Sequence, residues 1–309
     1  MADVTDAAFR RIIAKYGKPD VMYTEFVSSA GLCSEKGRKR LCIDLLYHKS
    51  ERPIVAQLFG ADPEQMEESA ALVVELGFDG VDINMGCPDR AIEKQGAGAA
   101  LIKNPELAAE LIAAAKRGAG DIPVSVKTRI GYRENTMSTW LPALLEAEPA
   151  AIVIHARTRK EMSKVPAHWD TLEGAAMLAK KYGTQRGHTL ILGNGDVKNL
   201  SEAKEKAERY GLDGVMIGRG IFGNPWLFNE KKRKKVPTTK ERLRVLAEHV
   251  TLYEKMYKGI KNFDIMKKHF KAYAHGFDGA KELRVALMGT HRAEEVDAVI
   301  KMHKLTKTR

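Results

Sequence analysis

The stretch that decides the fold is Gly80-Val81-Asp82-Ile83-Asn84-Met85-Gly86-Cys87-Pro88. Apolar, β-prone residues run into a glycine, a cysteine and a proline, which is typical of a buried strand that breaks sharply into a loop. Gly86 permits a turn that other residues resist, and Pro88 stops the strand from continuing. Strand ends of this kind gather ligands and reactive groups in parallel α/β proteins. The pattern predicts a chemical role for Cys87, although most cysteines are small buried apolar residues.

Similar apolar segments recur along the chain, and helix-like segments separate them. The helix-like segments include residues 63–76, 105–117 and 201–210, which carry apolar residues at helical spacing. Alternating strands and helices indicate a parallel sheet. Seven such strands over about 220 residues favour a (β/α)8 TIM barrel over an open sheet. The predicted strands are residues 21–26, 54–60, 80–86, 124–130, 151–157, 190–196 and 214–220.

Seven strands are one fewer than a complete barrel contains. The chain opens with a predicted helix that Thr5 caps and Gly17 ends, and only residues 1–4 precede it. We therefore expect the sequence to begin inside the first strand–helix loop, so that the barrel lacks its first strand. The alternative is that another segment forms an eighth strand that the pattern does not reveal.

The character of the sequence changes near residue 230. A basic segment at 231–237 predicts a solvated linker between a barrel domain, residues 1–230, and a helical domain, residues 238–309. Three helices are expected in the second domain, at residues 240–258, 263–275 and 293–305. Residues 1–230 are nearly neutral, at −1, whereas residues 231–309 carry +12. This asymmetry favours a module that binds polyanions, with a solubilised helical surface as the alternative.

Composition narrows the class of protein further. The 309 residues carry a net charge of +11 and a hydrophobic fraction of 44%, as expected for a soluble protein. No apolar run is long enough to span a bilayer, and the N-terminus has no secretory signal. The three cysteines, Cys33, Cys42 and Cys87, have no metal-ligand spacing, so we expect no metal site. Sparse, odd-numbered cysteines fit the reducing cytoplasm.

Two glycine-rich strand ends follow one another late in the predicted barrel. Asn194, Gly195 and Asp196 follow the sixth strand, and Gly218 and Arg219 follow the seventh. The last two loops of a TIM barrel are its usual phosphate site. Glycines let backbone N–H groups approach an anion, and arginine adds a forked donor. We therefore expect a phosphate cradle here, with simple tight turns as the alternative.

Other strand ends carry polar side chains where a barrel interior should be dry. Gln57 lies on the second predicted strand, Lys127 and Arg129 on the fourth, and His155 and Arg157 on the fifth. Residues two apart in a strand point to the same side, so each pair is expected to face one way. Several polar groups at one barrel mouth favour a polar ring ligand. Together with a phosphate cradle, they suit a flavin mononucleotide.

At this point the chain resembles the tRNA-dihydrouridine synthase family, FMN-dependent barrels that reduce uridine in tRNA. The resemblance covers nearly the whole chain. The motifs that carry it are Val4-Thr5-Asp6, Gln57-Leu58-Phe59-Gly60, Asp82 to Pro88, Gly96-Ala97-Gly98-Ala99-Ala100-Leu101, Val126-Lys127-Thr128-Arg129, His155-Ala156-Arg157-Thr158-Arg159, Trp169-Asp170, Gly193-Asn194-Gly195-Asp196, Gly218 to Trp226 and Gly279-Ala280-Lys281-Glu282-Leu283-Arg284. The chain departs from the family at Met162-Ser163-Lys164, where Tyr-Ser-Gly is common.

The resemblance implies roles for particular residues. Cys87 would donate a proton to C5 of uracil, and Asn84 and Arg129 would contact the uracil ring. NADPH would reduce the FMN, tRNA would be the substrate partner, and a monomer is expected. The residues that the resemblance implies for FMN binding are Gln57, Lys127, His155, Asn194, Gly195, Asp196, Gly218 and Arg219.

Two other functions fit parts of the sequence. An FMN-dependent pyrimidine or dihydroorotate dehydrogenase would share the flavin site but gives no reason for the basic helical domain. An RNA-binding protein without catalysis would explain the basic domain but not Cys87 beside two glycine-rich loops. Both alternatives stay open on the sequence alone.

Overall fold

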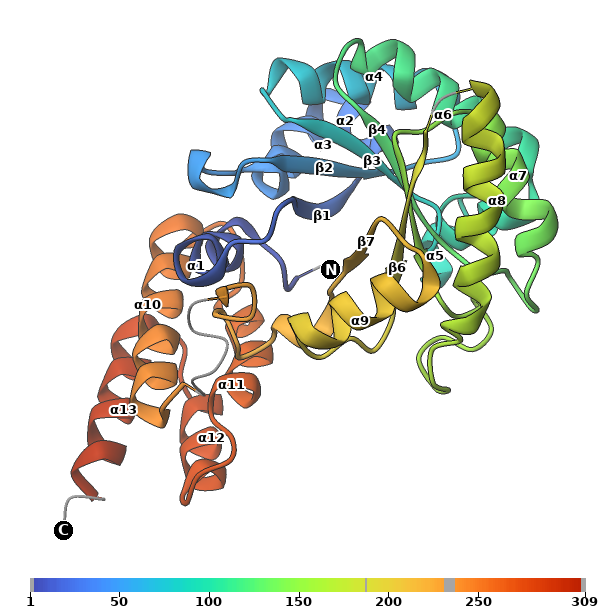
Figure 1. Ribbon diagram of the computed structural model, residues 1–309. Coiled ribbons are helices and arrows are strands. Elements are labelled where there is room, and N and C mark those ends of the chain that lie inside the picture. The colour runs from blue at the N-terminus through green and yellow to red at the C-terminus, as the bar shows by residue number, and fades with distance from the viewer. Residues whose placement is uncertain (1–2, 187, 231–236, 307–309) are drawn as a thin grey trace. The chain divides into compact units, whose positions relative to one another are not determined.

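The computed structural model describes residues 3–186, 188–230 and 237–306 (Figure 1). Within these residues the chain forms two compact units. The barrel unit contains residues 21–46 and 52–219, and the helical unit contains residues 3–20, 47–51 and 220–306. Most of the expected linker, residues 231–236, lies outside the described residues. The functional division at residues 230 and 238 stays a prediction.

The barrel unit contains one parallel sheet of seven strands in sequence order, which curls into an open half-barrel (Figure 1). All seven predicted strands are confirmed, and so is the TIM-barrel class. No eighth strand occurs in the part of the chain that the structure describes. The strands are β1 (Met22–Ser28), β2 (Ile54–Phe59), β3 (Gly80–Asn84), β4 (Val124–Arg129), β5 (Ala151–His155), β6 (Leu190–Asn194) and β7 (Gly214–Met216).

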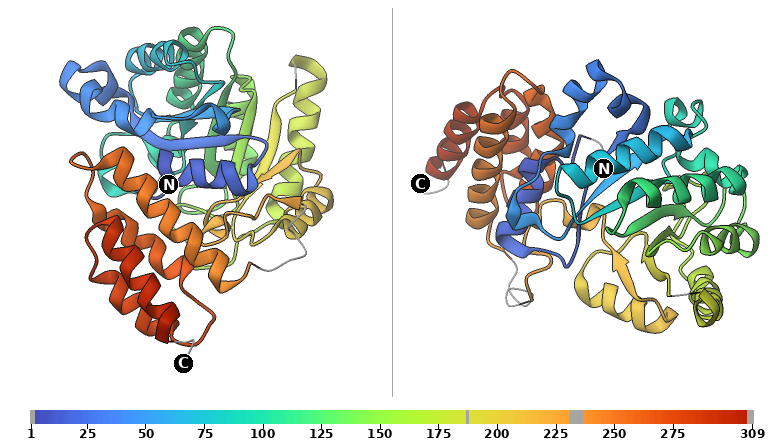
Figure 2. Two further views of the ribbon diagram at one scale, coloured as in Figure 1. Left: turned by 90° about the vertical axis from the view of Figure 1, so that its left-hand side faces the viewer. Right: turned by 90° about the horizontal axis from the view of Figure 1, so that it is seen from above.

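Helices lie along the outer face of this sheet (Figure 2). Asp62 and Asn104 cap two of these helices, since each accepts a hydrogen bond from a backbone N–H of the first turn. The α-helices of the unit are α2 (Ser29–Cys33), α3 (Glu35–Leu41), α4 (Pro63–Glu75), α5 (Arg90–Glu93), α6 (Pro105–Ala119), α7 (Met137–Glu146), α8 (Asp170–Arg186) and α9 (Leu200–Tyr210). Short 3-10 segments cover Cys42–Leu45 and Gly98–Lys103.

The register of the strands sets polar residues side by side. Asn84 of β3 pairs with Lys127 of β4, and Arg129 of β4 pairs with His155 of β5. His155 in turn pairs with Asn194 of β6. Because side chains alternate with a period of two, these positions fall on one face of the sheet near its carboxyl edge. The register therefore assembles the candidate site.

The helical unit is built from α1 (Ala7–Gly17), α10 (Thr239–Tyr257), α11 (Lys267–Tyr273), α12 (Ala280–Met288) and α13 (Ala293–Thr306), with 3-10 turns at Lys49–Glu51 and Phe263–Met266. The helices predicted near residues 5, 240, 263 and 293 are confirmed, whereas α12 was not predicted. The predicted cap of α1 is one residue off. Asp6 caps α1 in place of Thr5, and Thr238 caps α10 through a reciprocal capping box with Glu241. No helix in the described ranges has the length and apolar character needed to cross a membrane.

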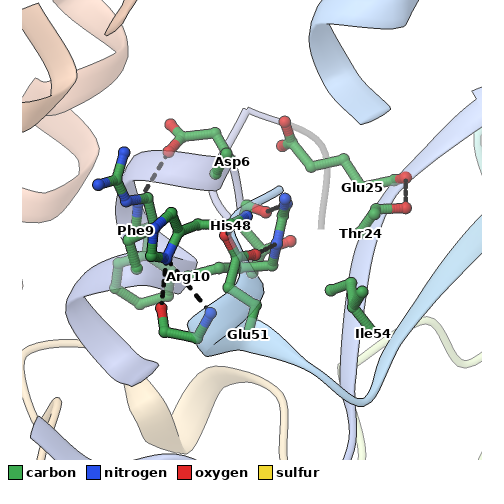
Figure 3. Close-up of polar contacts among 12 residues, drawn as sticks. Asp6, Phe9, Arg10, Thr24, Glu25, His48, Glu51 and Ile54 are labelled. Atoms are coloured by element: carbon green, nitrogen blue, oxygen red, sulfur yellow. Dashed lines mark hydrogen bonds and ion pairs between the residues drawn. The ribbon is translucent and has the colours of Figure 1, made fainter. Parts of the chain in front are cut away.

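A buried ion pair joins α1 to the segment at residues 47–51 (Figure 3). Arg10 Nε donates to Glu51 Oε2 at 2.7 Å, and the two side chains are 4% and 0% exposed. Glu51 Oε1 also accepts from the backbone N–H of His48 at 2.7 Å. The Glu51 carboxylate therefore connects a segment distant in sequence to the helical unit.

Replacing Glu51 by glutamine should destabilise the helical unit by about 3 kcal/mol, because Arg10 then stays buried without its compensating charge. Urea unfolding followed by circular dichroism measures the effect. The matched control is Glu35→Gln, which removes an exposed carboxylate paired with Lys39 and should cost about 0.5 kcal/mol or less. Equal losses in the free energy of unfolding for Glu51→Gln and Glu35→Gln would contradict a larger contribution from the buried pair than from the exposed one.

Candidate functional site

All eleven candidate residues lie in the barrel unit, on or just after strands β2 to β7. The structure brings most of them together through hydrogen bonds between neighbouring strands. The three groups that result are the Cys87 loop after β3, the Lys127 pair on β4 and β6, and an arginine cluster around Asp196.

The Cys87 loop is held by the side chain at the end of β3. Asn84 Oδ1 accepts hydrogen bonds from the backbone N–H groups of Gly86 at 3.1 Å and Cys87 at 2.9 Å. The Cys87 carbonyl accepts from the N–H of Ala99 at 2.9 Å. Cys87 is half-buried, and burial raises the pKa of its thiol. The thiol is therefore protonated near neutral pH and is able to donate a proton.

A chain of hydrogen bonds continues from Asn84 into the sheet. Asn84 Nδ2 donates to Gln57 Oε1 at 3.2 Å, and Gln57 Nε2 donates to Asp82 Oδ2 at 2.7 Å. Ser125 Oγ donates to the other oxygen of Asp82 at 2.6 Å. Burial raises the pKa of Asp82 to about 6. No role was predicted for Asp82, although a carboxylate in the middle of a buried strand was the available signal.

Lys127 is paired with an amide from the strand two positions along the sheet. Its Nζ donates to Asn194 Oδ1 at 3.1 Å, and Asn194 Nδ2 donates to the carbonyl of Met216 at 2.9 Å. Burial, with a smaller contribution from Arg129, lowers the pKa of Lys127 to about 8. A half-buried ammonium whose hydrogen-bond partner is a neutral amide is suited to a ligand that brings anionic or carbonyl oxygen.

The third group centres on Asp196. One of its oxygens forms an ion pair with Arg157, and the other accepts from Arg219 at 2.9 Å. Burial opposes ionisation, but the hydrogen bond from Arg157 and the two guanidinium charges hold the pKa of Asp196 below its usual value. Asp196 thus orients two arginines, one buried and one exposed.

His155 lies beside this group and is neutral. Arg157 lies 3.1 Å from His155 Nε2, and a guanidinium only donates, so Nε2 accepts and the proton sits on Nδ1. Burial and the surrounding cations, Lys127 first among them, lower the pKa of His155 to about 2. Sequence analysis named Arg157 only as a neighbour of His155, because its partner Asp196 is 39 residues away.

Arg129 connects two loops at the mouth of the half-barrel. Its Nε donates to the carbonyl of Gly86 at 2.7 Å, and its Nη1 donates to the carbonyls of Thr158 and Met162 at 3.1 Å each. The side chain is buried. These bonds tie the Cys87 loop to residues 158–162, and the expected contact with uracil stays a prediction.

The two late glycines follow strands β6 and β7. Gly195 has a φ of +135°, which other residues rarely adopt. A Cβ added at Gly218 would meet nothing within 4 Å, so its backbone borders open space. Together with Arg219 and Lys127, these residues fit a flavin phosphate and ring. Among the described residues, no group of three or more His, Cys, Asp or Glu side chains could hold a metal ion.

Solved structures of low sequence identity share the fold. A variant of NCR from Zymomonas mobilis matches with a TM-score of 0.51 at 17% identity, over 76% of this chain and 83% of that one. Histamine dehydrogenase from Rhizobium sp. 4-9 matches with a TM-score of 0.50 at 13% identity, over 80% of this chain and 46% of that one. Such likenesses support the barrel architecture and nothing finer.

Sequence relatives identify the family of the chain more specifically than these structures do. A protein of Staphylococcus aureus (strain COL) named "Probable tRNA-dihydrouridine synthase" is 42% identical over 302 residues, which cover 97% of this chain and 90% of the relative. A protein of Bacillus subtilis (strain 168) named "Probable tRNA-dihydrouridine synthase 2" is 41% identical over 302 residues, covering 97% and 91%. The family model described as dihydrouridine synthase (Dus) matches residues 1–308. The chain therefore belongs to the dihydrouridine synthase family of oxidoreductases.

Proposed function

We propose that this protein reduces uridine to 5,6-dihydrouridine in tRNA, with NADPH as the reductant. The observation that carries the proposal is the thiol of Cys87, on a loop that Asn84 and Arg129 hold at the carboxyl edge of a flavin-type barrel. Family membership and the names of the relatives support the choice of tRNA as substrate. We also propose that the protein acts as a monomer in the cytoplasm.

The cofactor in this proposal is FMN. When bound and reduced, FMN would supply a hydride to C6 of the uracil ring. Lys127 and His155 would face the ring, and Asn194 would orient Lys127 through their hydrogen bond. Gly195, Gly218 and Arg219 would receive the phosphate, while Asp196 would hold the two arginines in place. Gln57 would complete the polar edge of the site.

Cys87 would supply the second hydrogen. As C6 gains a hydride, the C5–C6 double bond becomes electron-rich at C5, and the thiol proton moves from Sγ to C5. One hydride and one proton saturate the bond, and the thiolate regains a proton from solvent. Arg129 carries a positive charge near Sγ, which favours the transient thiolate. Asn84 has one side-chain N–H beyond the bond to Gln57 with which to contact a uracil carbonyl.

The helical unit would bind the tRNA backbone. Residues 231–309 carry +12, and exposed lysines lie on or just after α10 and α11. Phosphate contacts of this kind give affinity without sequence preference. A uridine in folded RNA must be turned out of its stack to reach a reactive thiol. In this proposal the basic helices supply affinity and the barrel supplies chemistry.

Replacing Cys87 by alanine should lower dihydrouridine formation by about 10²- to 10⁴-fold, the usual contribution of a general acid. Oxidation of NADPH by the bound flavin should continue, because Cys87 takes no part in that step. Dihydrouridine content of uridine-containing tRNA and flavin absorbance measure the two quantities.

The matched control is Cys33→Ala, since Cys33 is also half-buried with a pKa raised by burial. It should leave activity unchanged. Full activity in Cys87→Ala would contradict the role of the thiol. Product from dihydroorotate or a free pyrimidine, and none from tRNA, would favour the small-molecule dehydrogenase instead.

Affinity for FMN should fall as the pH rises through about 8, because Lys127 loses the charge that attracts the flavin. Fluorescence titration of FMN between pH 6.5 and 9 measures this. Lys127→Met should bind FMN more weakly at pH 7 and show little pH dependence. The control Lys103→Met removes an exposed lysine and should behave as wild type. Unaltered pH dependence in Lys127→Met would exclude Lys127 as the titrating group.

The helical unit should account for the salt dependence of tRNA binding. Replacing Lys255, Lys258 and Lys271 by glutamine should weaken binding and reduce the slope of log K against log salt by as much as about 3, one for each phosphate deprived of its lysine. Filter binding at several salt concentrations measures the slope. Removing three exposed lysines of the barrel unit, Lys116, Lys180 and Lys204, should change it little. Equal effects from both sets would argue against a tRNA-binding role specific to the helical unit.

A further inference from the structure

Asp82 is a fully buried carboxylate in the middle of β3. Such a position in a parallel sheet normally holds valine or isoleucine, and burying a charge there is unfavourable. Its two oxygens accept from Gln57 at 2.7 Å and Ser125 at 2.6 Å. The hydrogen bond from Gln57 thus connects Asp82, through Asn84, to the Cys87 loop.

Because Asp82 is an acceptor, it determines which group donates and which accepts in the hydrogen bonds that connect it to Gln57 and Asn84. An ionised carboxylate only accepts, so Gln57 must turn its Nε2 toward Asp82 and its Oε1 toward Asn84. Gln57 Oε1 only accepts, so Asn84 must present its Nδ2 to Gln57. Asn84 Oδ1 is then left facing the loop, where it accepts from the N–H groups of Gly86 and Cys87.

We propose that Asp82 is a positioning residue for the reaction, which orients Gln57 and Asn84 so that the Cys87 loop is held for proton donation. This inference rests on the function proposed above for Cys87. If the amide of Asn84 turned over, it would present N–H groups to the two backbone N–H groups, and both loop hydrogen bonds would break. If the amide of Gln57 turned over, its N–H₂ would face that of Asn84, and the hydrogen bond that orients Asn84 would be lost. An acceptor at position 82 prevents that.

The charged groups around Asp82 are consistent with an acceptor. Lys127 of β4 favours the ionised carboxylate, as do the hydrogen bonds from Ser125 and Gln57. Tyr23 of β1 stays protonated, because burial and the Asp82 charge both raise its pKa. Above pH 7 the carboxylate is therefore ionised for most of the time, since its pKa is about 6.

The test compares Asp82→Val with Asp82→Asn. Valine removes the acceptor, so exchange of the Gly86 and Cys87 amide hydrogens should accelerate about tenfold. With FMN saturating, kcat should fall about 10- to 100-fold, while KM for tRNA stays within about twofold. Asparagine can still accept from Gln57 while its N–H₂ donates to Ser125 Oγ. Asp82→Asn should therefore keep the slow exchange and most of the activity.

A loss of stability must be separated from a loss of positioning. Asp82→Val leaves the buried donors of Gln57 and Ser125 without their acceptor, so it should unfold at a somewhat lower urea concentration than wild type. Exchange and kcat are therefore compared without urea, where both proteins are fully folded. Ser125→Ala is the matched control, because it removes the other hydrogen bond to Asp82 but leaves Gln57 its acceptor. It should have near wild-type exchange and kcat.

Two results would overturn the proposal. One is slow exchange at Gly86 and Cys87 in Asp82→Val, which would mean that the loop does not depend on Asp82. The other is an equal loss in Asp82→Asn and Asp82→Val, which would assign the effect to charge rather than to an acceptor. Hydrogen exchange needs neither tRNA nor turnover. It therefore tests the positioning role even if the protein proves to reduce another substrate.

Discussion

The two hydrogen bonds from the backbone of Gly86 and Cys87 to Asn84 Oδ1 are the constraint on which the site depends. These bonds end β3 and begin the loop, because the Asn84 side chain replaces the carbonyls of the neighbouring strand as hydrogen-bond acceptor. Glycine suits the position beside them, since a Cβ at Gly86 would lie only 3.2 to 3.4 Å from the Thr128 backbone. The thiol position thus follows from local backbone chemistry, and the neighbouring strands hold the loop through Arg129.

The electrostatics of the barrel unit are governed by cations that burial brings close together. Lys127 and Arg129 both have lowered pKa values, about 8 and about 10, chiefly because of burial. His155 responds to the same crowding by staying neutral. Asp82 and Asp196 compensate only part of this positive charge. Asp82 lies within β3, and Asp196 lies just after the end of β6. A ligand with a phosphate and carbonyl oxygens would relieve the remaining repulsion, which is why a flavin suits this sheet edge better than a neutral ligand would.

The sequence predicted the sheet well, because each strand is a nearly continuous apolar run bounded by turn residues. It predicted helix starts to within one residue, and Asp6 replaced Thr5 because the carboxylate reaches the N–H of Phe9. Helix α12 was missed. The candidate site was predictable where residues lie two apart on one strand. The partners of Asp82, Asp196 and Arg129 were not, since they depend on strand register and on loops that only the folded chain brings together.

Several cations of the helical unit are paired with carboxylates of the same unit. Arg10 is neutralised inside the unit by Glu51, and Lys267 and Lys301 are paired with Asp264 and Asp297 along their own helical segments. Such pairs at the surface are weak and exchange readily for another anion, whereas the buried pair does not. A polyanion would therefore recruit the exposed lysines and leave Arg10 in place. The unit thus combines a buried ion pair with a solvated set of cations at its surface.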